Sequence, residues 1–362
     1  MDLSAKIKNL PSCSGVYLMK DSLNGVIYVG KSKNLKNRVS SYFQNSKSHT
    51  PKVIKLVKNL KDFDYITTDT EFEAFMLECK LIKEIKPLYN KLMKSSKSYC
   101  YIKIKFNEKH PYIDLSSVYV KDDDGIYFGP YTSKSIVERA IQGVKEYCKI
   151  LCTNESQRKA YCLYYSLGFC IGMCLDKVSK EKYFDIFNKI VNLFNGTDES
   201  IIKGIELNMN SSSKKSAFEK AIKYRDYLAS INYVIDKAKV VKYTEENKNI
   251  VLLEYLSDDI FKFFLIKGNK VLFSDKYIVK DLDIKKLKYF LKNNILSYFN
   301  NISINDSIKV GREEVDESQI IYTYLENKSN DCRYFVVLKQ WLKNINDVDF
   351  DHEIDKLLLA KS

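Results

Sequence analysis

The stretch GVYLMKDSLNGVIYVGKSKNLKNR, residues 15–38, decides the fold of the N-terminal region. GVYLMK and GVIYVG are rich in Val, Ile and Tyr and flank SLNG, a pattern typical of two strands joined by a turn. Because successive side chains of a strand alternate between faces, Tyr17 and Tyr28 are predicted to lie on the same face of this hairpin. Its apolar residues account for folding, so the polar residues need another explanation.

The residues after the second strand are strongly basic. KSKNLKNRVSSYF, residues 31–43, has apolar residues at helical spacing and is predicted to form a helix. Lys31 and Lys33 at its start suit an anion, and Gly30 before them would let a phosphate approach the backbone closely. The alternative is a half-buried hairpin with solvated lysines.

A second predicted helix, in EFEAFMLECKLIKEIKP (residues 71–87), places one acid beside an apolar stripe. That acid is Glu78, whereas the other acids of the helix have easier access to water: Glu71, Glu73 and Glu84. A carboxylate near a core needs a cation, hydrogen-bond donors or a metal. The alternative is a snorkelling side chain or a salt bridge to Lys80 or Lys83.

The composition is that of a basic chain with ample apolar residues. It has 362 residues, 45% of them hydrophobic, which suits two or three compact units. Its 59 Lys and Arg against 46 Asp and Glu give a net charge of +13, a bias that favours nucleic acid but also membrane surfaces and ribosomes. The sequence has no long apolar run and no signal-peptide core, so a soluble cytoplasmic protein without membrane contact is expected.

The pattern along the chain predicts an α+β multidomain protein with four blocks. IFKFFLIKGNKVLFSDKYIV, residues 260–279 in the last block, is expected to form a hairpin that turns at Gly268-Asn269. The Ser/Lys stretch 211–216 is expected to be a flexible connector. The blocks are a small α/β domain over 1–95, short strands followed by a helical cysteine-rich region over 96–199, a polar helical pair over 200–240, and a C-terminal α/β segment over 245–362.

Four ordered pieces of the chain resemble the GIY-YIG nuclease domain of the UvrC excinuclease subunit family. They are GVY (15–17), IYVGKSKNLKNRVSSYF (27–43), MLECKLIKEIKPLYN (76–90) and SKSYCYIKI (96–104). The resemblance implies hydrolysis of a phosphodiester bond with one divalent metal ion. It covers residues 1–280 well and the remainder weakly.

The resemblance implies a role for each matching residue. Glu78 would hold Mg²⁺ or Mn²⁺, and Arg38 would neutralise charge that grows on the scissile phosphate. Tyr28, assisted by Lys31, would help to deprotonate the attacking water, although which tyrosine acts as the base stays open. The other implied residues are Tyr17 and Tyr42, which would position water or phosphate, Asn90, which would hold the geometry of the site, and Gly30, Lys33 and Lys36, which would contact DNA.

The nine cysteines include four at the spacing C-x₉-C-x₇-C-x₃-C: Cys152, Cys162, Cys170 and Cys174. Four thiolates suit a tetrahedral Zn²⁺ or an iron–sulfur cluster, and the spacing does not choose between them. Several buried cysteines in an apolar helix are the other alternative. In the UvrC family the matching segment holds an iron–sulfur cluster, so the resemblance implies [4Fe–4S], with Zn²⁺ as the alternative. Tyr161 and Met173 replace prolines that the family usually has.

Residues 216–235, SAFEKAIKYRDYLASINYVI, have apolar residues at helical intervals, as an ordinary amphipathic core helix also would. They resemble the UVR motif, a two-helix module that docks on UvrB in this family. The residues expected to contact that partner are Phe218, Ala221, Arg225, Asp226 and Leu228.

The function implied is a metal-dependent DNA endonuclease of nucleotide excision repair, acting as a monomer on damaged double-stranded DNA presented by UvrB, with UvrA upstream. No later RNase H-like pattern or helix-hairpin-helix tail is found, so the chain resembles the shorter Cho-type homologue that cuts on the 3′ side. One alternative is a GIY-YIG nuclease of a mobile-element or phage-type pathway. Another is a non-catalytic protein that binds DNA or UvrB.

Overall fold

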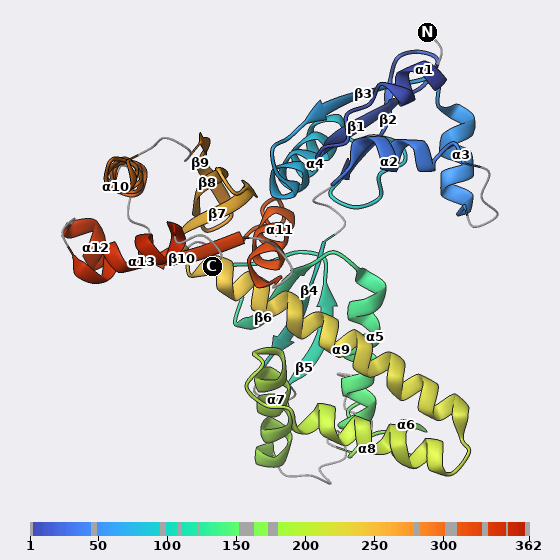
Figure 1. Cartoon of the computed structure of the whole chain (residues 1–362). Helices are drawn as coiled ribbons and strands as arrows, with labels where there is room; N and C mark the ends of the chain where they lie inside the picture. The colour runs from blue at the N-terminus through green and yellow to red at the C-terminus, as the bar shows by residue number, and fades with distance from the viewer. Residues whose placement is uncertain are drawn as a thin grey trace. The chain divides into compact units, whose positions relative to one another are not determined.

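The computed structural model describes residues 3–44, 49–94, 99–106, 111–121, 123–151, 163–172, 180–278, 283–300, 310–327, 332–344 and 347–358. The chain divides into two compact units, one made of residues 1–96 and 243–362 and the other of residues 97–242 (Figure 1). The fold is α+β, as the sequence predicts. No described helix has the length and apolar character needed to cross a bilayer.

The N-terminal part of the first unit is a three-stranded antiparallel sheet of order β2-β1-β3 with helices around it. Tyr17 pairs with Gly30 and Met19 with Tyr28 across the hairpin, so Tyr17 and Tyr28 share a face, as predicted. The elements are α1 (Leu3–Lys8), β1 (Gly15–Lys20), β2 (Val26–Ser32), α2 (Leu35–Ser41), α3 (Pro51–Asn59), β3 (Asp62–Thr67) and α4 (Glu71–Ile85).

Helix α2 begins four residues later than the sequence predicts. Asn34 is its N-cap, and the side chain of Asn34 accepts a hydrogen bond from the backbone N–H of Asn37. Lys31 and Ser32 instead continue strand β2, whose pairing with β1 extends to Ser32. The prediction that Lys31 stands at a helix start is therefore wrong, because the cap at Asn34 sets the helix boundary.

Helix α4 starts with a capping box and is apolar on two sides. Thr70 accepts from the Glu73 backbone N–H, and the Glu73 side chain accepts from the Thr70 N–H. Ala74 and Ile82 pack with strands β1 and β2, while Phe72 packs against β7 (Asn249–Ser257) and β8 (Ile260–Lys267) of the C-terminal part. The helix is thus covered by two different sheets.

The C-terminal part of the first unit is a four-stranded antiparallel sheet of order β10-β7-β8-β9. Lys267 pairs with Lys270 around Gly268, which confirms the predicted turn. One face of the sheet packs on α10, α12 and α13, and the other on α11 and α4. The elements are β7 (Asn249–Ser257), β8 (Ile260–Lys267), β9 (Lys270–Ile278), α10 (Ile284–Asn300), α11 (Val315–Glu326), β10 (Cys332–Val337), α12 (Lys339–Lys343) and α13 (Val348–Leu358).

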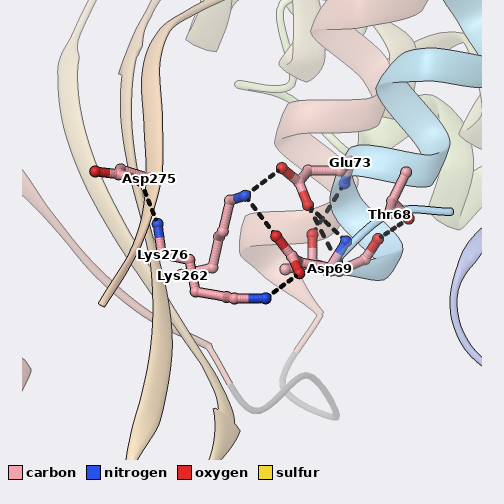
Figure 2. A network of polar contacts seen from close by, with 7 residues as sticks. Thr68, Asp69, Glu73, Lys262, Asp275 and Lys276 are labelled. Carbon is pink, nitrogen blue, oxygen red and sulfur yellow. Dashed lines mark hydrogen bonds and ion pairs between the residues drawn. The ribbon is translucent and has the colours of Figure 1, made fainter. Parts of the chain in front are cut away.

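Ion pairs join this sheet to the start of α4 (Figure 2). The Lys262 ammonium lies 2.8 Å from an Asp69 carboxylate oxygen and 2.9 Å from one of Glu73. Lys276 lies 2.7 Å from the other oxygen of Asp69. Because the Lys262 side chain is only 10% exposed, these contacts are shielded from solvent more than ordinary surface pairs are.

The second unit packs helices on one face of the sheet β5-β4-β6. The predicted helical pair is present as α8 and α9, but α8 continues to Lys214, so most of the Ser/Lys stretch 211–216 is helical and not a connector. The elements are β4 (Cys100–Lys105), β5 (Tyr112–Ser116), β6 (Gly125–Tyr131), α5 (Lys134–Tyr147), α6 (Leu163–Ser166), α7 (Lys180–Phe194), α8 (Ser200–Lys214) and α9 (Phe218–Glu245).

Candidate active site

Three tyrosines from separate elements meet on one face of the N-terminal sheet. Tyr17 lies on β1, Tyr28 on β2, and Tyr42 directly follows α2. The hydroxyl oxygens of Tyr17 and Tyr42 are 2.9 Å apart. The ring centroid of Tyr17 lies 6.2 Å from that of Tyr28 and 5.9 Å from that of Tyr42. Tyr17 is therefore the centre of this tyrosine cluster.

Gly30 makes room for the central tyrosine. A Cβ built on Gly30 would lie 2.4 Å from the Tyr17 hydroxyl oxygen and 2.5 Å from the ring carbon that carries it. The sequence pattern suggests a phosphate at this close approach, but the phenol of Tyr17 occupies it instead. The requirement for glycine thus comes from side-chain packing.

One basic side chain of α2, that of Arg38, lies next to the tyrosine cluster. The guanidinium carbon of Arg38 is 5.1 Å from the centroid of the Tyr42 ring. Lys33, just before α2, and Lys36, in its first turn, are exposed. Arg38 is thus placed to meet an anion at the tyrosines, and the two lysines are open to a neighbouring stretch of a polyanion.

Glu78 on α4 faces the end of β2. Its Oε1 atom accepts a hydrogen bond from the backbone N–H of Lys31 at 3.0 Å. Burial raises the pKa of Glu78, while this hydrogen bond and the charges of Lys31 and Arg38 act in the opposite direction. Glu78 in turn contributes to a raised pKa of Tyr28, so carboxylate and phenol lie close enough to interact.

The side chain of Lys31 is bound to α4. Its ammonium lies 3.2 Å from Oε1 of Glu71 and 3.3 Å from the centroid of the Phe75 ring. Glu71 was missed by sequence reasoning, which placed it in water. The available signal was its position seven residues before Glu78, since residues two turns apart share a helix face. Lys31 therefore contacts Glu78 through its backbone N–H, while its ammonium contacts Glu71 and Phe75.

The phenols of Tyr17 and Tyr28 are protonated at neutral pH. Burial is the largest cause that raises both pKa values, and the neighbouring Tyr42 raises them further, whereas Arg38 lowers them. Because both pKa values lie above the ordinary value of about 10, neither phenol can serve as a base at pH 7 without additional positive charge.

Asn90 holds the segment after α4 on strand β2. Its Oδ1 accepts from the Val29 N–H at 3.0 Å, and its Nδ2 donates to the Val29 carbonyl at 2.9 Å. The side chain is 8% exposed, so both bonds are sheltered from water. Since Val29 follows Tyr28, this contact holds the strand at the point where the tyrosine projects.

The residues around Glu78 fit a hydrated divalent cation. Within the described part of the chain, no three His, Cys, Asp or Glu side chains gather as a ligand set. A cation at Glu78 would therefore have at most two such ligands among the described residues. Mg²⁺ commonly keeps several waters and is held by one or two carboxylates, so this donor set suits Mg²⁺ or Mn²⁺.

The predicted cysteine cluster falls mostly outside the described residues. Cys152, Cys162 and Cys174 are not described, and Cys170 is 6% exposed in an isolated bridge with Ile150. The [4Fe–4S] cluster and the Zn²⁺ alternative therefore remain predictions.

The residues predicted to contact a partner differ in exposure. Phe218 is 63% exposed, Ala221 is half-buried, and Arg225 forms an ion pair of 3.1 Å with its neighbour Asp226. Leu228, in contrast, packs in the core of the second unit and is 8% exposed. The first turns of α9 are thus open to a partner, while Leu228 is occupied by the fold itself.

Three family models match successive parts of the chain. A UvrC-like GIY-YIG domain matches residues 13–91, the UvrC/Cho excinuclease middle domain residues 99–193, and the UvrB/uvrC motif residues 199–234. A solved structure, the GIY-YIG N-terminal endonuclease domain of UvrC from Thermotoga maritima bound to its catalytic divalent cation, magnesium, is 37% identical; it covers 25% of this chain and 96% of its own, with a TM-score of 0.23.

Curated relatives align with nearly the whole chain. UvrABC system protein C from Clostridium perfringens is 34% identical over 348 residues, which is 94% of this chain and 55% of the relative. The protein of the same name from Acetivibrio thermocellus is 34% identical over 342 residues, which is 93% of this chain and 55% of the relative. The chain thus spans about half the length of the relatives it matches. The three domain matches and these relatives agree, and the chain belongs to the UvrC family.

Proposed function

We propose that this chain is a metal-dependent endonuclease that hydrolyses a phosphodiester bond of damaged double-stranded DNA in excision repair. The observation that carries the proposal is the single carboxylate of Glu78, held at the end of β2 beside the tyrosine cluster and Arg38. In this arrangement Glu78 can bind a metal cation, the Arg38 guanidinium can bind a phosphate, and the phenols can hydrogen-bond water.

Differences in burial favour Tyr28 as the group that takes the proton from the attacking water. Tyr17 and Tyr42 are 1% and 5% exposed and lie within hydrogen-bond distance of each other, which suits positioning. Tyr28 is half-buried and interacts with Glu78. A divalent cation on Glu78 would supply the positive charge that lowers the pKa of the Tyr28 phenol and would stabilise negative charge on the phosphate.

Arg38 would stabilise charge on the phosphate as the bond breaks. Its guanidinium is always charged and donates in a planar fork that matches phosphate oxygens. Asn90 would act as a positioning residue, because it holds the strand that carries Tyr28. Lys31 would orient the Glu78 carboxylate through its backbone N–H.

Damage recognition would belong to a partner, since backbone contacts by lysine carry no sequence or lesion information. The UvrB/uvrC motif and the exposed first turns of α9 support docking to UvrB, with Phe218, Arg225 and Asp226 at the surface. The expected cut is on the 3′ side of the lesion.

The test is incision of a lesion-bearing duplex with UvrA, UvrB and Mg²⁺. Glu78→Gln and Arg38→Ala are expected to lower the single-turnover rate by at least about 100-fold, as loss of charge stabilisation typically does. Lys58→Gln, a change on α3 with no assigned role, is the control. Wild-type rates in both site variants would refute this site, and a chain that binds UvrB and DNA without cutting would be an accessory protein.

The cysteine-rich segment is proposed to hold a [4Fe–4S] cluster with a structural role. Iron analysis and anaerobic absorbance of the purified chain test this, and stoichiometric zinc without iron would overturn it.

A further inference from the structure

Two lysines that no role above uses lie at the strand that carries Tyr28, one over the Tyr28 ring and the other in the segment bound to that strand. Lys52, in the first turn of α3, has its ammonium 5.0 Å from the centroid of the Tyr28 ring. Lys91 directly follows Asn90, whose side chain forms two hydrogen bonds with Val29 on the strand that carries Tyr28. Burial lowers the pKa of Lys52, and the charge of Lys91 lowers it further, so the two ammonium groups repel each other.

Contacts within the domain hold the two lysines in this arrangement. The backbone N–H of Tyr89 donates to the Ile27 carbonyl at 2.9 Å, and Asn90 binds the same strand two residues further on. The Tyr89 hydroxyl accepts a hydrogen bond from the Asn59 side chain at the end of α3, at 2.6 Å. The segment that carries Lys91 is therefore tied to both β2 and α3.

No counter-ion of this lysine pair is found among the described residues. Helix α3 contains three lysines and no acid, and residues 86–94 also contain no acid. Within the described parts of the chain, neither Lys52 nor Lys91 forms an ion pair, although Lys20, Lys31 and Lys262 of the same unit do. The dipole of α3 also disfavours a cation in its first turn. An anion bound between the lysines would relieve both repulsions.

We propose that Lys52 and Lys91 bind a backbone phosphate of the DNA substrate next to the scissile phosphate. The proposal rests on the proposed nuclease function and extends it by naming where the strand runs. Arg38 lies over the Tyr42 ring and Lys52 over the Tyr28 ring, so two different rings of the tyrosine cluster each have a cation beside them. A strand whose scissile phosphate meets Arg38 then places a neighbouring phosphate at the lysine pair.

The experiment measures binding of the full chain to an undamaged duplex at several salt concentrations, without added divalent cation. Each phosphate contact contributes about 0.9 to the slope of log affinity against log salt. Because the two lysines share one phosphate, the double variant Lys52→Gln/Lys91→Gln is expected to lower the slope by about 0.9, and each single variant by part of that amount. Lys52→Arg keeps the charge and is expected to keep the wild-type slope.

Lys58→Gln is the matched control, because it removes one charge from the same helix six residues away. The proposal fails if Lys58→Gln lowers the slope as much as Lys52→Gln, since only net charge would then matter. It also fails if both Lys52→Gln and Lys91→Gln keep the wild-type slope. A chain that shows the expected lysine dependence but never cuts DNA would refute the nuclease function and support the lysine site.

Discussion

Replacing Gly30 by alanine is expected to disable the tyrosine cluster without removing any reactive group. The new Cβ would lie 2.4 Å from the Tyr17 hydroxyl oxygen, so the phenol has to move. Tyr17 is 1% exposed and packs with Leu35 and Val39, and overpacking of such a site costs about 1–3 kcal/mol. The lost contact with Tyr42 adds about 0.5–1.5 kcal/mol. The free energy of unfolding is therefore expected to fall by about 1.5–4.5 kcal/mol.

Urea unfolding and single-turnover incision measure the two consequences. Because Gly30→Ala displaces the phenol that organises Tyr28 and Tyr42, the incision rate of the folded variant is expected to fall at least about tenfold, equivalent to about 1.4 kcal/mol in the barrier. Gly25→Ala is the control in the same hairpin, since the atoms nearest to its Cβ would be those of the Asp21 carboxylate, at 3.3 Å and beyond. Its stability is expected to change by less than about 0.5 kcal/mol. A Gly30→Ala protein as stable and active as Gly25→Ala would refute this reasoning.

Three further changes test the surroundings of the site. Asn90→Ala leaves the Val29 N–H and carbonyl unpaired in a buried place and is expected to cost about 2–4 kcal/mol in urea unfolding. Lys262→Met is expected to lower the free energy of unfolding by about 1–3 kcal/mol, a value between those for an exposed and a fully buried ion pair. Lys270→Met, at an exposed lysine, is the neutral control. Burial raises the pKa of Glu254 to about 7, so between 4.5 and about 7 the folded chain keeps a proton that the unfolded chain releases. Stability should therefore fall as pH rises through this window, and Glu254→Gln should flatten that dependence; an unchanged slope would contradict it.

Local patterns in the sequence predicted the hairpin and the helix that carry the site. Alternation within GVYLMK and GVIYVG was enough to place Tyr17 and Tyr28 on one face, because the period of a strand does not depend on distant residues. The partners of Lys31 could not be obtained in this way, since Glu71 and Phe75 lie about 40 residues away in the chain. The same holds for Gly30, whose close neighbour Tyr17 follows only from the observed register.

The sequence predicts separate blocks over 1–95 and 245–362, but the structure places them in one compact unit. Helix α4 is the element that joins them. An apolar residue on a helix indicates that something covers it, but not which segment does so. Phe72 is 1% exposed, and its ring lies 5.2 Å from that of Phe264 and 4.9 Å from that of Tyr324. The helix that carries Glu78 is therefore packed between the strand pair of the candidate active site and the C-terminal sheet. Since packed interiors transmit strain, a change of volume at Phe264 is expected to reach the carboxylate at Glu78 through α4.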